Sequence, residues 1–281
     1  MEPPAGFRYV DAHTHLHPPR LFTAIRRWFD EHTDWNLRGP SEPDDVVAAL
    51  RAAGVERFAF FSYAHRPGMA RDLNRWIRDT AVRFPDGIPL GTVHAADEDP
   101  GAVVDEACGT WGLRGLKIHI QVQRFHPDDP RMWPVYQRLS ELGRVLVIHV
   151  GTGPHTNEVT GLARFARVLE AFPGLRASVC HMGAFETRLA LQLLDRFPNL
   201  RLDTTMALTR ASTPYTGIDP GVVRDRDLVR HADRILFGSD FPNLPYPYEE
   251  ERQDLWARDL PLAVYQRIFR DNALAFFGVR L

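Results

Sequence analysis

Two histidines separated by a single residue close the segment YVDAHTH at residues 9–15. Its apolar and β-branched opening predicts a buried strand, and alternate side chains of a strand share a face. We therefore expect Asp11, His13 and His15 to point the same way. Neutral imidazole nitrogen is a ligand for zinc and related divalent ions. A histidine pair is by itself more often a solvated surface feature, so the prediction of a metal site depends on what later segments contribute.

Further polar residues stand at the ends of later apolar segments. GLKIH carries Lys117 and His119, and VLVIH ends in His149. His181 follows RASVC, and Asp240 lies within ILFGSDF. Each has an ordinary explanation as a hydrogen-bonded loop residue. Their repeated position at segment ends is what indicates a common site.

Eight short apolar segments alternate with helical patterns along the chain. The predicted strands are 9–15, 57–62, 89–95, 115–120, 145–150, 176–182, 200–206 and 235–241. The helical patterns include 69–84, 130–142, 160–172, 185–197, 225–232 and 262–277. Continuous apolar strands alternating with helices indicate a parallel sheet covered on both faces, and eight such units favour a closed barrel. We predict an α/β fold, a single (β/α)8 TIM barrel forming one domain over residues 1–281. An open doubly wound sheet is the alternative, but no G-x-G-x-x-G follows the first strand.

In such a barrel the carboxyl ends of the strands form one ring. By strand alternation His149 shares a face with Val145 and Val147, and His181 shares one with Val179. Asp240 likewise aligns with Gly238 and Leu236. Facing inward, these groups and the first-strand histidines would supply nitrogen and carboxylate ligands and leave coordination open for water, as a catalytic metal requires. Cys180 has the opposite parity to His181 and is expected to be buried facing outward.

The ordered set DAHTH, GLKIH, VLVIHVG, CHMG and ILFGSDFP resembles the amidohydrolase superfamily over essentially the whole chain. The most similar branch is the amidohydrolase-related group that includes aminocarboxymuconate-semialdehyde decarboxylase-like enzymes and predicted metal-dependent hydrolases. The resemblance implies metal ligands at His13, His15, His149 and Asp240. It also implies a catalytic or substrate-polarising role for His181, and proton transfer by Asp240.

Strand alternation in GLKIH places Lys117 on the inward face with His119. Lys117 has two interpretations under this resemblance. Binuclear members use a carboxylated lysine on the fourth strand to bridge two metals. The interpretation we favour is a lysine that binds a substrate carboxylate or completes a buried ion pair, with one divalent metal in the site. Zinc is the expected ion, and manganese, iron or cobalt would suit the same ligands. His119 and Arg124 are further candidates for substrate binding.

The predicted activity is hydrolysis of an amide, ester or lactone bond in a small, carboxylate-bearing substrate, using water activated by the metal. The nearest alternative is a metal-dependent non-oxidative decarboxylase of a small carboxylic acid. A deoxyribonuclease of the same barrel type would call for a glutamate ligand near the fourth strand, where Lys117 and His119 stand instead. A barrel that only binds a ligand would be expected to lack a ligand or proton-transfer position, and none is missing.

Composition adds expectations about partners and location. The net charge of −2 and the pI near 6.6 give no indication of nucleic-acid or membrane binding. Cys108 and Cys180 form no C-x-x-C pair, which favours a reducing cytoplasm. We see no signal peptide and no apolar run long enough to span a bilayer. Aromatic residues such as Trp28 and Trp35 are compatible with a homodimer.

Overall fold

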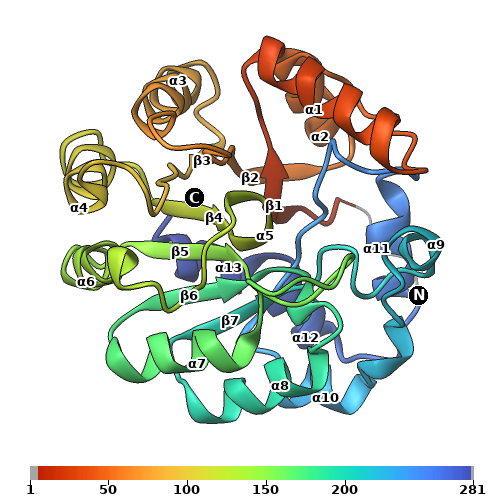
Figure 1. Ribbon diagram of the computed structural model, residues 1–281. Coiled ribbons are helices and arrows are strands. Elements are labelled where there is room, and N and C mark those ends of the chain that lie inside the picture. The colour runs from red at the N-terminus through yellow and green to blue at the C-terminus, as the bar shows by residue number, and fades with distance from the viewer. Residues whose placement is uncertain (1–5, 280–281) are drawn as a thin grey trace.

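Eight parallel strands form the centre of the computed structural model, which describes residues 6–279 (Figure 1). The strands are β1 (Tyr9–His15), β2 (Val55–Phe61), β3 (Gly87–Pro89), β4 (Gly115–His119), β5 (Val145–His149), β6 (Arg176–Val179), β7 (Leu200–Asp203) and β8 (Ile235–Leu236). They pair in sequence order, as β1-β2-β3 and as β4-β5-β6-β7-β8. Sequential parallel pairing with helical crossovers is the arrangement of a (β/α)8 barrel, which confirms the predicted fold class.

The ladder is interrupted at two seams, and single parallel bridges lie at both. Gly91, beyond the end of β3, bridges to Leu116 of β4. Thr14 of β1 bridges to Phe241, beyond the end of β8, and the Ala12 amide donates to the carbonyl of Phe237 at 2.8 Å. The two sheets therefore follow one another around a common centre, although neither seam carries a continuous ladder.

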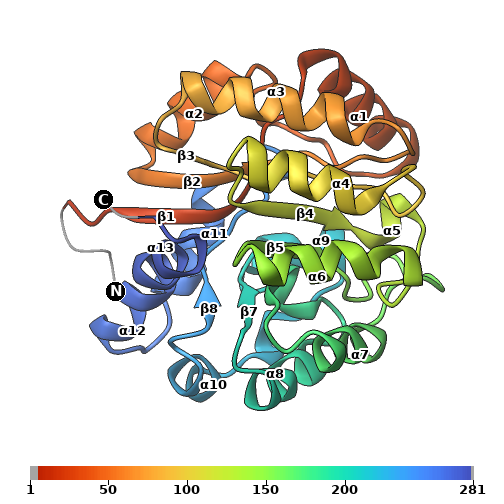
Figure 2. The same cartoon turned by 90° about the vertical axis from the view of Figure 1, so that its left-hand side faces the viewer.

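Helices surround the strands on all sides, as Figures 1 and 2 show. The helices of the first half are α1 (Pro19–His32), α2 (Pro43–Ala52), α3 (Ala70–Arg83), α4 (Pro100–Val104), α5 (Ile120–Gln123) and α6 (Trp133–Glu141). Those of the second half are α7 (Leu162–Ala171), α8 (Thr187–Arg196), α9 (Thr213–Thr216), α10 (Asp225–Arg230), α11 (Glu249–Trp256), α12 (Leu262–Gln266) and α13 (Asn272–Phe277). Within residues 6–279, none of the helices is both long and apolar enough to pass through a membrane.

The core has an inner part, within the barrel, and an outer part, between strands and helices. The inner cluster is built from apolar residues in the strands or directly after them: Val10, Ala12, Ala59, Phe61, Ile88, Leu90, Val145, Val147, Cys180 and Leu236. Helix α13 lies beside the start of β1 and adds Ala273, Phe276 and Phe277 to this cluster (Figure 2). The amino-terminal end of the barrel is thus filled with apolar side chains, and polar groups are left to the opposite end.

The third, sixth, seventh and eighth strands are shorter than predicted, since β6 ends at Val179 and β7 at Asp203, and the third and eighth differ most. The third was predicted over 89–95, but β3 ends at Pro89. The Asn74 side chain bonds both the amide and the carbonyl of Thr92, at 2.7 Å and 2.9 Å, so these groups leave the ladder. The last was predicted over 235–241, but β8 ends at Leu236, and Asp240 further on adopts a left-handed backbone with φ of 71°.

The last predicted helix, 262–277, is helical throughout but not as one α-helix. It consists of α12, a π-helical turn over Arg267–Asp271, and α13. The wider turn keeps the chain helical while inserting one extra residue. Ile268 and Phe269 of this turn are fully buried. The segment therefore supplies the outer core beside β1 and β8 as well as the inner cluster.

Glu251 of α11 is a buried acid whose ionisation should set part of the pH dependence of stability. Burial raises its pKa well above the ordinary 4.5, although bonds from Tyr246 and the Met206 amide partly offset this. A raised acid pKa gives stability that is fully present below about pH 4.5 and is lost as the pH rises. In metal-free protein, Glu251→Gln should therefore gain stability relative to the wild type between pH 4.5 and neutrality, measured by denaturant unfolding. Exposed Glu249→Gln is the control, and a pH-independent difference would contradict the expectation.

Candidate metal centre

Three of the predicted metal ligands meet at the carboxyl end of the barrel. Nε2 of His15 lies 2.8 Å from Oδ1 of Asp240, and Nε2 of His13 lies 3.2 Å from the same oxygen. The candidate ligand atoms of His13, His15 and Asp240 all lie within 4.8 Å of one another. A metal bonded to two ligands at about 2.1 Å and at right angles leaves their atoms roughly 3 Å apart. The spacing of the three atoms thus suits a divalent ion.

Asp203, at the end of β7, fixes the orientation of His13. Its Oδ2 lies 3.0 Å from Nδ1 of His13, and its Oδ1 accepts the His181 amide at 2.8 Å. A proton on Nδ1 of His13 satisfies this contact and turns Nε2 toward Asp240, where Nε2 could offer its lone pair to a bound metal. Carboxylate–histidine pairs of this kind orient metal ligands and increase their basicity. Strand-end motifs indicated no role for Asp203, although its position at the end of an apolar strand is the signal that marks it.

Asp203→Asn should weaken metal binding without unfolding the protein. Asparagine keeps the shape of the side chain but removes the negative charge beside Nδ1 of His13. Replacing a partner of this kind costs about 10- to 100-fold in metal affinity. Competition with a coloured chelator would measure the change, with Asp233→Asn on the surface as the control. Equal affinity in the Asp203 and Asp233 variants would show that the contact does not support the site.

The loops at this end of the barrel contain an unusual number of strained residues. Residues 6–279 contain six non-glycine residues with positive φ, and all six follow strand ends: Arg124, His181, Met182, Ala184, Met206 and Asp240. Such conformations cost about 1 to 3 kcal/mol each and cluster at functional sites. Gly238 is part of the same construction, because a Cβ there would lie 2.7 Å from Cβ of His13. The backbone at this end is thus shaped around the polar side chains.

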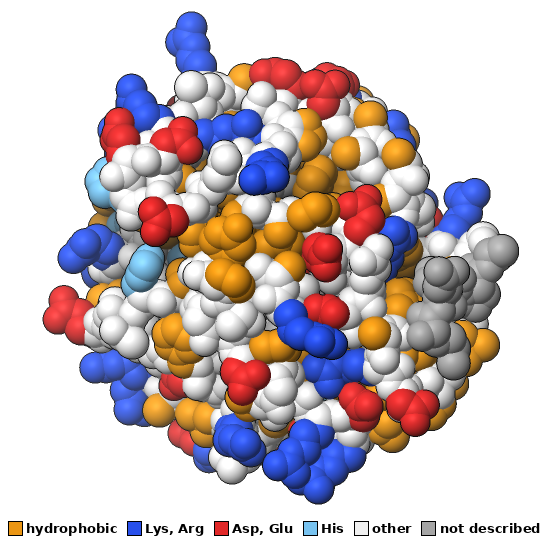
Figure 3. All heavy atoms as spheres, turned by 90° about the vertical axis from the view of Figure 1, so that its right-hand side faces the viewer, with side chains coloured by type: hydrophobic (Ala, Val, Ile, Leu, Met, Phe, Trp, Pro, Cys, Tyr) orange, Lys and Arg blue, Asp and Glu red, His pale blue; other side chains and the backbone are white. Residues whose placement is uncertain are grey.

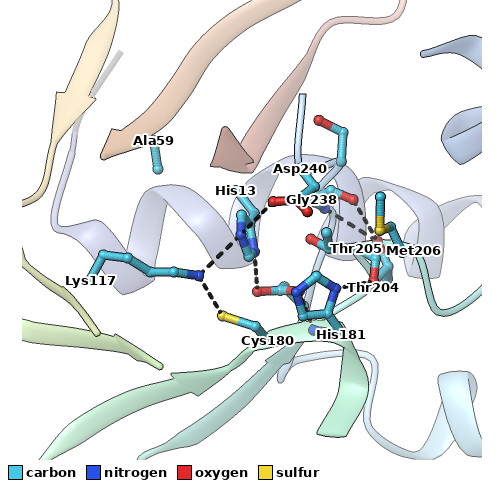
Figure 4. A network of polar contacts seen from close by, with 12 residues as sticks. His13, Ala59, Lys117, Cys180, His181, Thr204, Thr205, Met206, Gly238 and Asp240 are labelled. Atoms are coloured by element: carbon cyan, nitrogen blue, oxygen red, sulfur yellow. Dashed lines mark hydrogen bonds and ion pairs between the residues drawn. The ribbon is translucent and has the colours of Figure 1, made fainter. Parts of the chain in front are cut away.

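His181 reaches the site by a different route from the one predicted. The expected alignment with Val179 is wrong, because Val179 belongs to the outer core and Cys180 to the inner cluster. The strand ends at Val179, and His181 then adopts φ of 56°, which turns its side chain back over the barrel. Cys180, expected to face outward, instead places its sulfur 3.0 Å from Nζ of Lys117 inside the barrel (Figure 4). Strand alternation does not extend past a left-handed residue.

His181 presents one ring nitrogen to the site. Its Nδ1 lies 3.1 Å from the Thr205 carbonyl, so Nδ1 carries the proton and Nε2 keeps a lone pair. Burial is the main reason that the pKa of His181 falls to about 4, against an opposing contribution from Asp240. The imidazole is therefore neutral near pH 7. A neutral ring with a free lone pair can accept a proton or bind a metal.

His149 is inward-facing as predicted, but the structure does not bring it into the ligand group. Its Nε2 lies 3.0 Å from the Gly153 carbonyl, and its ring stacks on that of His119 at 4.0 Å. The His181 ring packs against it at 4.7 Å. Burial, with His181 and Lys117 nearby, holds the pKa of His149 well below its usual range. Its role as a fourth ligand stays a prediction.

Asp11 was expected to share the face of His13 and His15 and does not. The pairing of β1 with β2 shifts between Asp11 and Thr14, so strand alternation is broken there. The carboxylate of Asp11 instead accepts the hydroxyls of Ser239 and Tyr248 and the His13 amide. A β-bulge of this kind redirects side chains locally.

Lys117 is fully buried inside the barrel and directly contacts His13, one of the predicted metal ligands. Its Nζ is 3.1 Å from Nε2 of His13 (Figure 4). The same atom is 4.8 Å from the centre of the Phe61 ring. The inward orientation predicted for Lys117 is therefore observed. The contacts with His13 and Cys180 describe a buried amine within the polar network, while its role toward a substrate stays a prediction.

A cavity of about 880 Å³ opens above these groups. His13, His15, Lys117, His119, His149, His181 and Asp240 contribute to its polar floor. One wall comes from α1 and the chain that follows, and its apolar members are Leu21, Ala24, Ile25, Trp28, Phe29 and Trp35. Arg124 also lines the cavity and brings a positive charge. The space combines a metal-binding floor, an apolar wall and a cation.

Comparison with known proteins identifies the family of this chain. A family model described as amidohydrolase matches residues 10–279. The chain belongs to the amidohydrolase family. Family membership and the His13, His15 and Asp240 group together support an enzyme that binds a divalent metal. The resemblance predicted from the strand-end motifs is thereby confirmed.

Solved structures similar to this amidohydrolase share its barrel. One is an uncharacterized TIM-barrel protein from Bordetella bronchiseptica, with 21% identity over 97% of this chain and 100% of that one, and a TM-score of 0.75. Another is 5-carboxyvanillate decarboxylase from Novosphingobium aromaticivorans, complexed with manganese and 4-hydroxy-3-methoxy-5-nitrobenzoic acid. It has 16% identity over 98% of this chain and 97% of that one, and a TM-score of 0.67. A third is 2,6-dihydroxybenzoate decarboxylase from Rhizobium, with 16% identity over 96% of this chain and 98% of that one, and a TM-score of 0.65. At these identities the likeness shows the fold.

Proposed function

We propose that this amidohydrolase is a metal-dependent non-oxidative decarboxylase of a small carboxylic acid. The observation that carries the proposal is the composition of the cavity, in which an apolar wall faces a floor of potential metal ligands and Arg124 adds a cation. Such a cavity suits a small molecule with an apolar body and a carboxylate. Two similar barrels are named as decarboxylases, which favours this activity over the hydrolysis first predicted.

The residues at the floor would divide the work between binding and proton transfer. His13, His15 and Asp240 would hold the metal, with His149 as a further ligand. The ion supplies positive charge that polarises the bound acid. Loss of carbon dioxide leaves an electron pair on carbon, and a proton must replace the departing group. Asp240 and His181 line the cavity and are the candidates to take that proton from solvent and pass it to the carbon.

Zinc is the ion we propose, on the basis of two imidazoles and a carboxylate in a compact group. Manganese, iron and cobalt accept the same ligands, and manganese is the ion in one of the similar barrels. A second metal bridged by carboxylated Lys117 is the less favoured arrangement. Metal analysis of protein purified without chelator would distinguish the two stoichiometries.

Hydrolysis is the second candidate, and one observation favours it. Neutral His181 offers a lone pair on Nε2, and together with Asp240 it could take the proton from an attacking water. Decarboxylation releases carbon dioxide and takes up one solvent proton at carbon, whereas hydrolysis releases an acid. Incubation of metal-loaded protein in deuterated water with aromatic acids, and separately with esters, lactones and amides, would separate the two. The decarboxylase proposal would be overturned if an ester, lactone or amide released acid while none of the tested substrates released carbon dioxide.

Arg124→Gln should raise KM for a carboxylate substrate while leaving kcat within a few-fold of the wild type. A charge-assisted hydrogen bond contributes about 1.5 to 3 kcal/mol, so KM should rise about 10-fold or more. Arg131→Gln is the matched control, because Arg131 is exposed and pairs with neighbouring Asp129. A KM unchanged by the Arg124 substitution would show that the substrate carboxylate binds elsewhere.

We also propose that the partner is a small molecule, with neither nucleic acid nor membrane involved. On the face in Figure 3, basic and acidic side chains are interspersed around an apolar area, so this face presents no continuous basic surface. Trp28 of α1 is about half exposed, at 49%. A homodimer and a cytoplasmic location stay predictions, and sedimentation of the purified protein would test the former.

A further inference from the structure

Asp11 is a buried carboxylate that the proposed chemistry does not use. It is fully buried, and it is absent from the residues that line the cavity. Three hydrogen bonds end on its two oxygens. Oδ1 accepts the His13 amide at 3.1 Å, and Oδ2 accepts the hydroxyls of Ser239 at 2.6 Å and Tyr248 at 3.0 Å. Asp11 therefore bonds other residues of the chain and does not reach a substrate in the cavity.

Two of these three bonds lead to proposed metal ligands. The first holds the backbone of His13 itself. The second holds Ser239, which precedes Asp240, and the same hydroxyl accepts the Phe241 amide at 3.0 Å. Asp240 therefore lies between Ser239, which bonds Asp11 directly, and Phe241, whose amide bonds the Ser239 hydroxyl. Its own amide donates to the His13 carbonyl at 2.9 Å, which brings the two strand ends together.

The backbone of Asp240 needs such support because it is strained. Its φ of 71° lies in the left-handed region, which non-glycine residues adopt at a cost. Without the bonds at Ser239, the turn could relax and withdraw the carboxylate from Nε2 of His13 and His15. The third bond comes from the hydroxyl of Tyr248, which immediately precedes α11; the Tyr248 ring packs on Phe241 at 5.3 Å, a contact that phenylalanine in its place would keep.

We propose that Asp11 is a positioning residue that sets the separation of His13 and Asp240 and so tunes metal affinity. It acts through the His13 amide and the Ser239 hydroxyl, with no contact to metal or substrate. The proposal rests on the metal site of the proposed function and is independent of which reaction the metal supports.

The test compares the metal affinity of variants of Asp11 and of two of its hydrogen-bond partners, Ser239 and Tyr248, in metal-depleted full-length protein. Mn²⁺ titration, followed by the free-ion electron paramagnetic resonance signal, gives the dissociation constant. Asp11→Asn and Ser239→Ala should each weaken binding about 10- to 100-fold, the range for residues that orient metal ligands. Because Ser239 acts through its bond to Asp11, the double variant should bind little more weakly than Asp11→Asn alone. Tyr248→Phe removes the bond to Asp11 and the contact of the same hydroxyl with Tyr9, and it should change affinity less than about 3-fold.

The unfolding free energy of each metal-free variant separates positioning from a merely structural role. Asp11→Asn and Tyr248→Phe should both lose stability, but only the former should lose affinity. Asp11→Asn with unchanged affinity, or Tyr248→Phe with as large a loss as Ser239→Ala, would overturn the proposal. Wild-type protein that binds no Mn²⁺ would overturn it together with the metal site, whereas Mn²⁺ binding without decarboxylation would count against the proposed reaction alone.

Discussion

Asp240→Asn is expected to remove most of the bound metal and to lower turnover by about 10²- to 10⁴-fold. The carboxylate is the anionic member of the group formed with His13 and His15. It is also a candidate for the proton transfer itself. Although burial opposes ionisation, the hydrogen bonds from His13 and His15 hold the pKa of Asp240 well below its usual range. An amide oxygen in its place would be neutral and a weaker ligand.

Asparagine is the suitable substitution because it tolerates the left-handed backbone at residue 240. The variant should therefore keep its circular dichroism spectrum while losing metal, as measured by elemental analysis. Asp86→Asn is the matched control, since Asp86 pairs with Arg51 at the surface, far from the cavity lining. Retained metal and full turnover in the Asp240 variant would place the ion elsewhere.

Gly115→Ala should destabilise the protein by about 3 kcal/mol or leave it insoluble. A Cβ on Gly115 would lie 2.0 Å from the Val145 carbonyl oxygen, where β4 meets β5. Because the clash is with backbone, the two strands must separate. Their register brings Lys117 beside Val147 and His119 beside His149, so the displacement would reach the polar floor.

Gly109→Ala provides the control for this prediction. Gly109 lies in the π-helical turn Asp105–Thr110, where an added Cβ meets nothing within 4 Å. The change should alter stability by less than about 1 kcal/mol. Denaturant unfolding measures both variants. A Gly115 variant as stable as the Gly109 variant would mean that the strands adjust without cost.

The sequence determined the barrel because the signals for it are local. Apolar strands and amphipathic helices repeat along the chain, and each pattern reports its own segment. The meeting of His13, His15 and Asp240 followed from the same repeats, since parallel strands place their carboxyl ends together, although Asp240 lies in the turn after β8. Lys117 was likewise placed facing inward by alternation within a regular strand, and its register opposite Val147 agrees.

Only the tertiary structure decided what happens where the strands stop being regular. Alternation predicted wrong orientations for Asp11, Cys180 and the His181–Val179 pair, because a register shift and left-handed residues intervene. The sequence also gave no role to Asp203, whose contact with His13 joins residues 190 positions apart. Strand periodicity is a property of neighbouring residues. The metal centre depends on the distances between the end of β1, the end of β7 and the turn after β8, which only the packing of the whole chain sets.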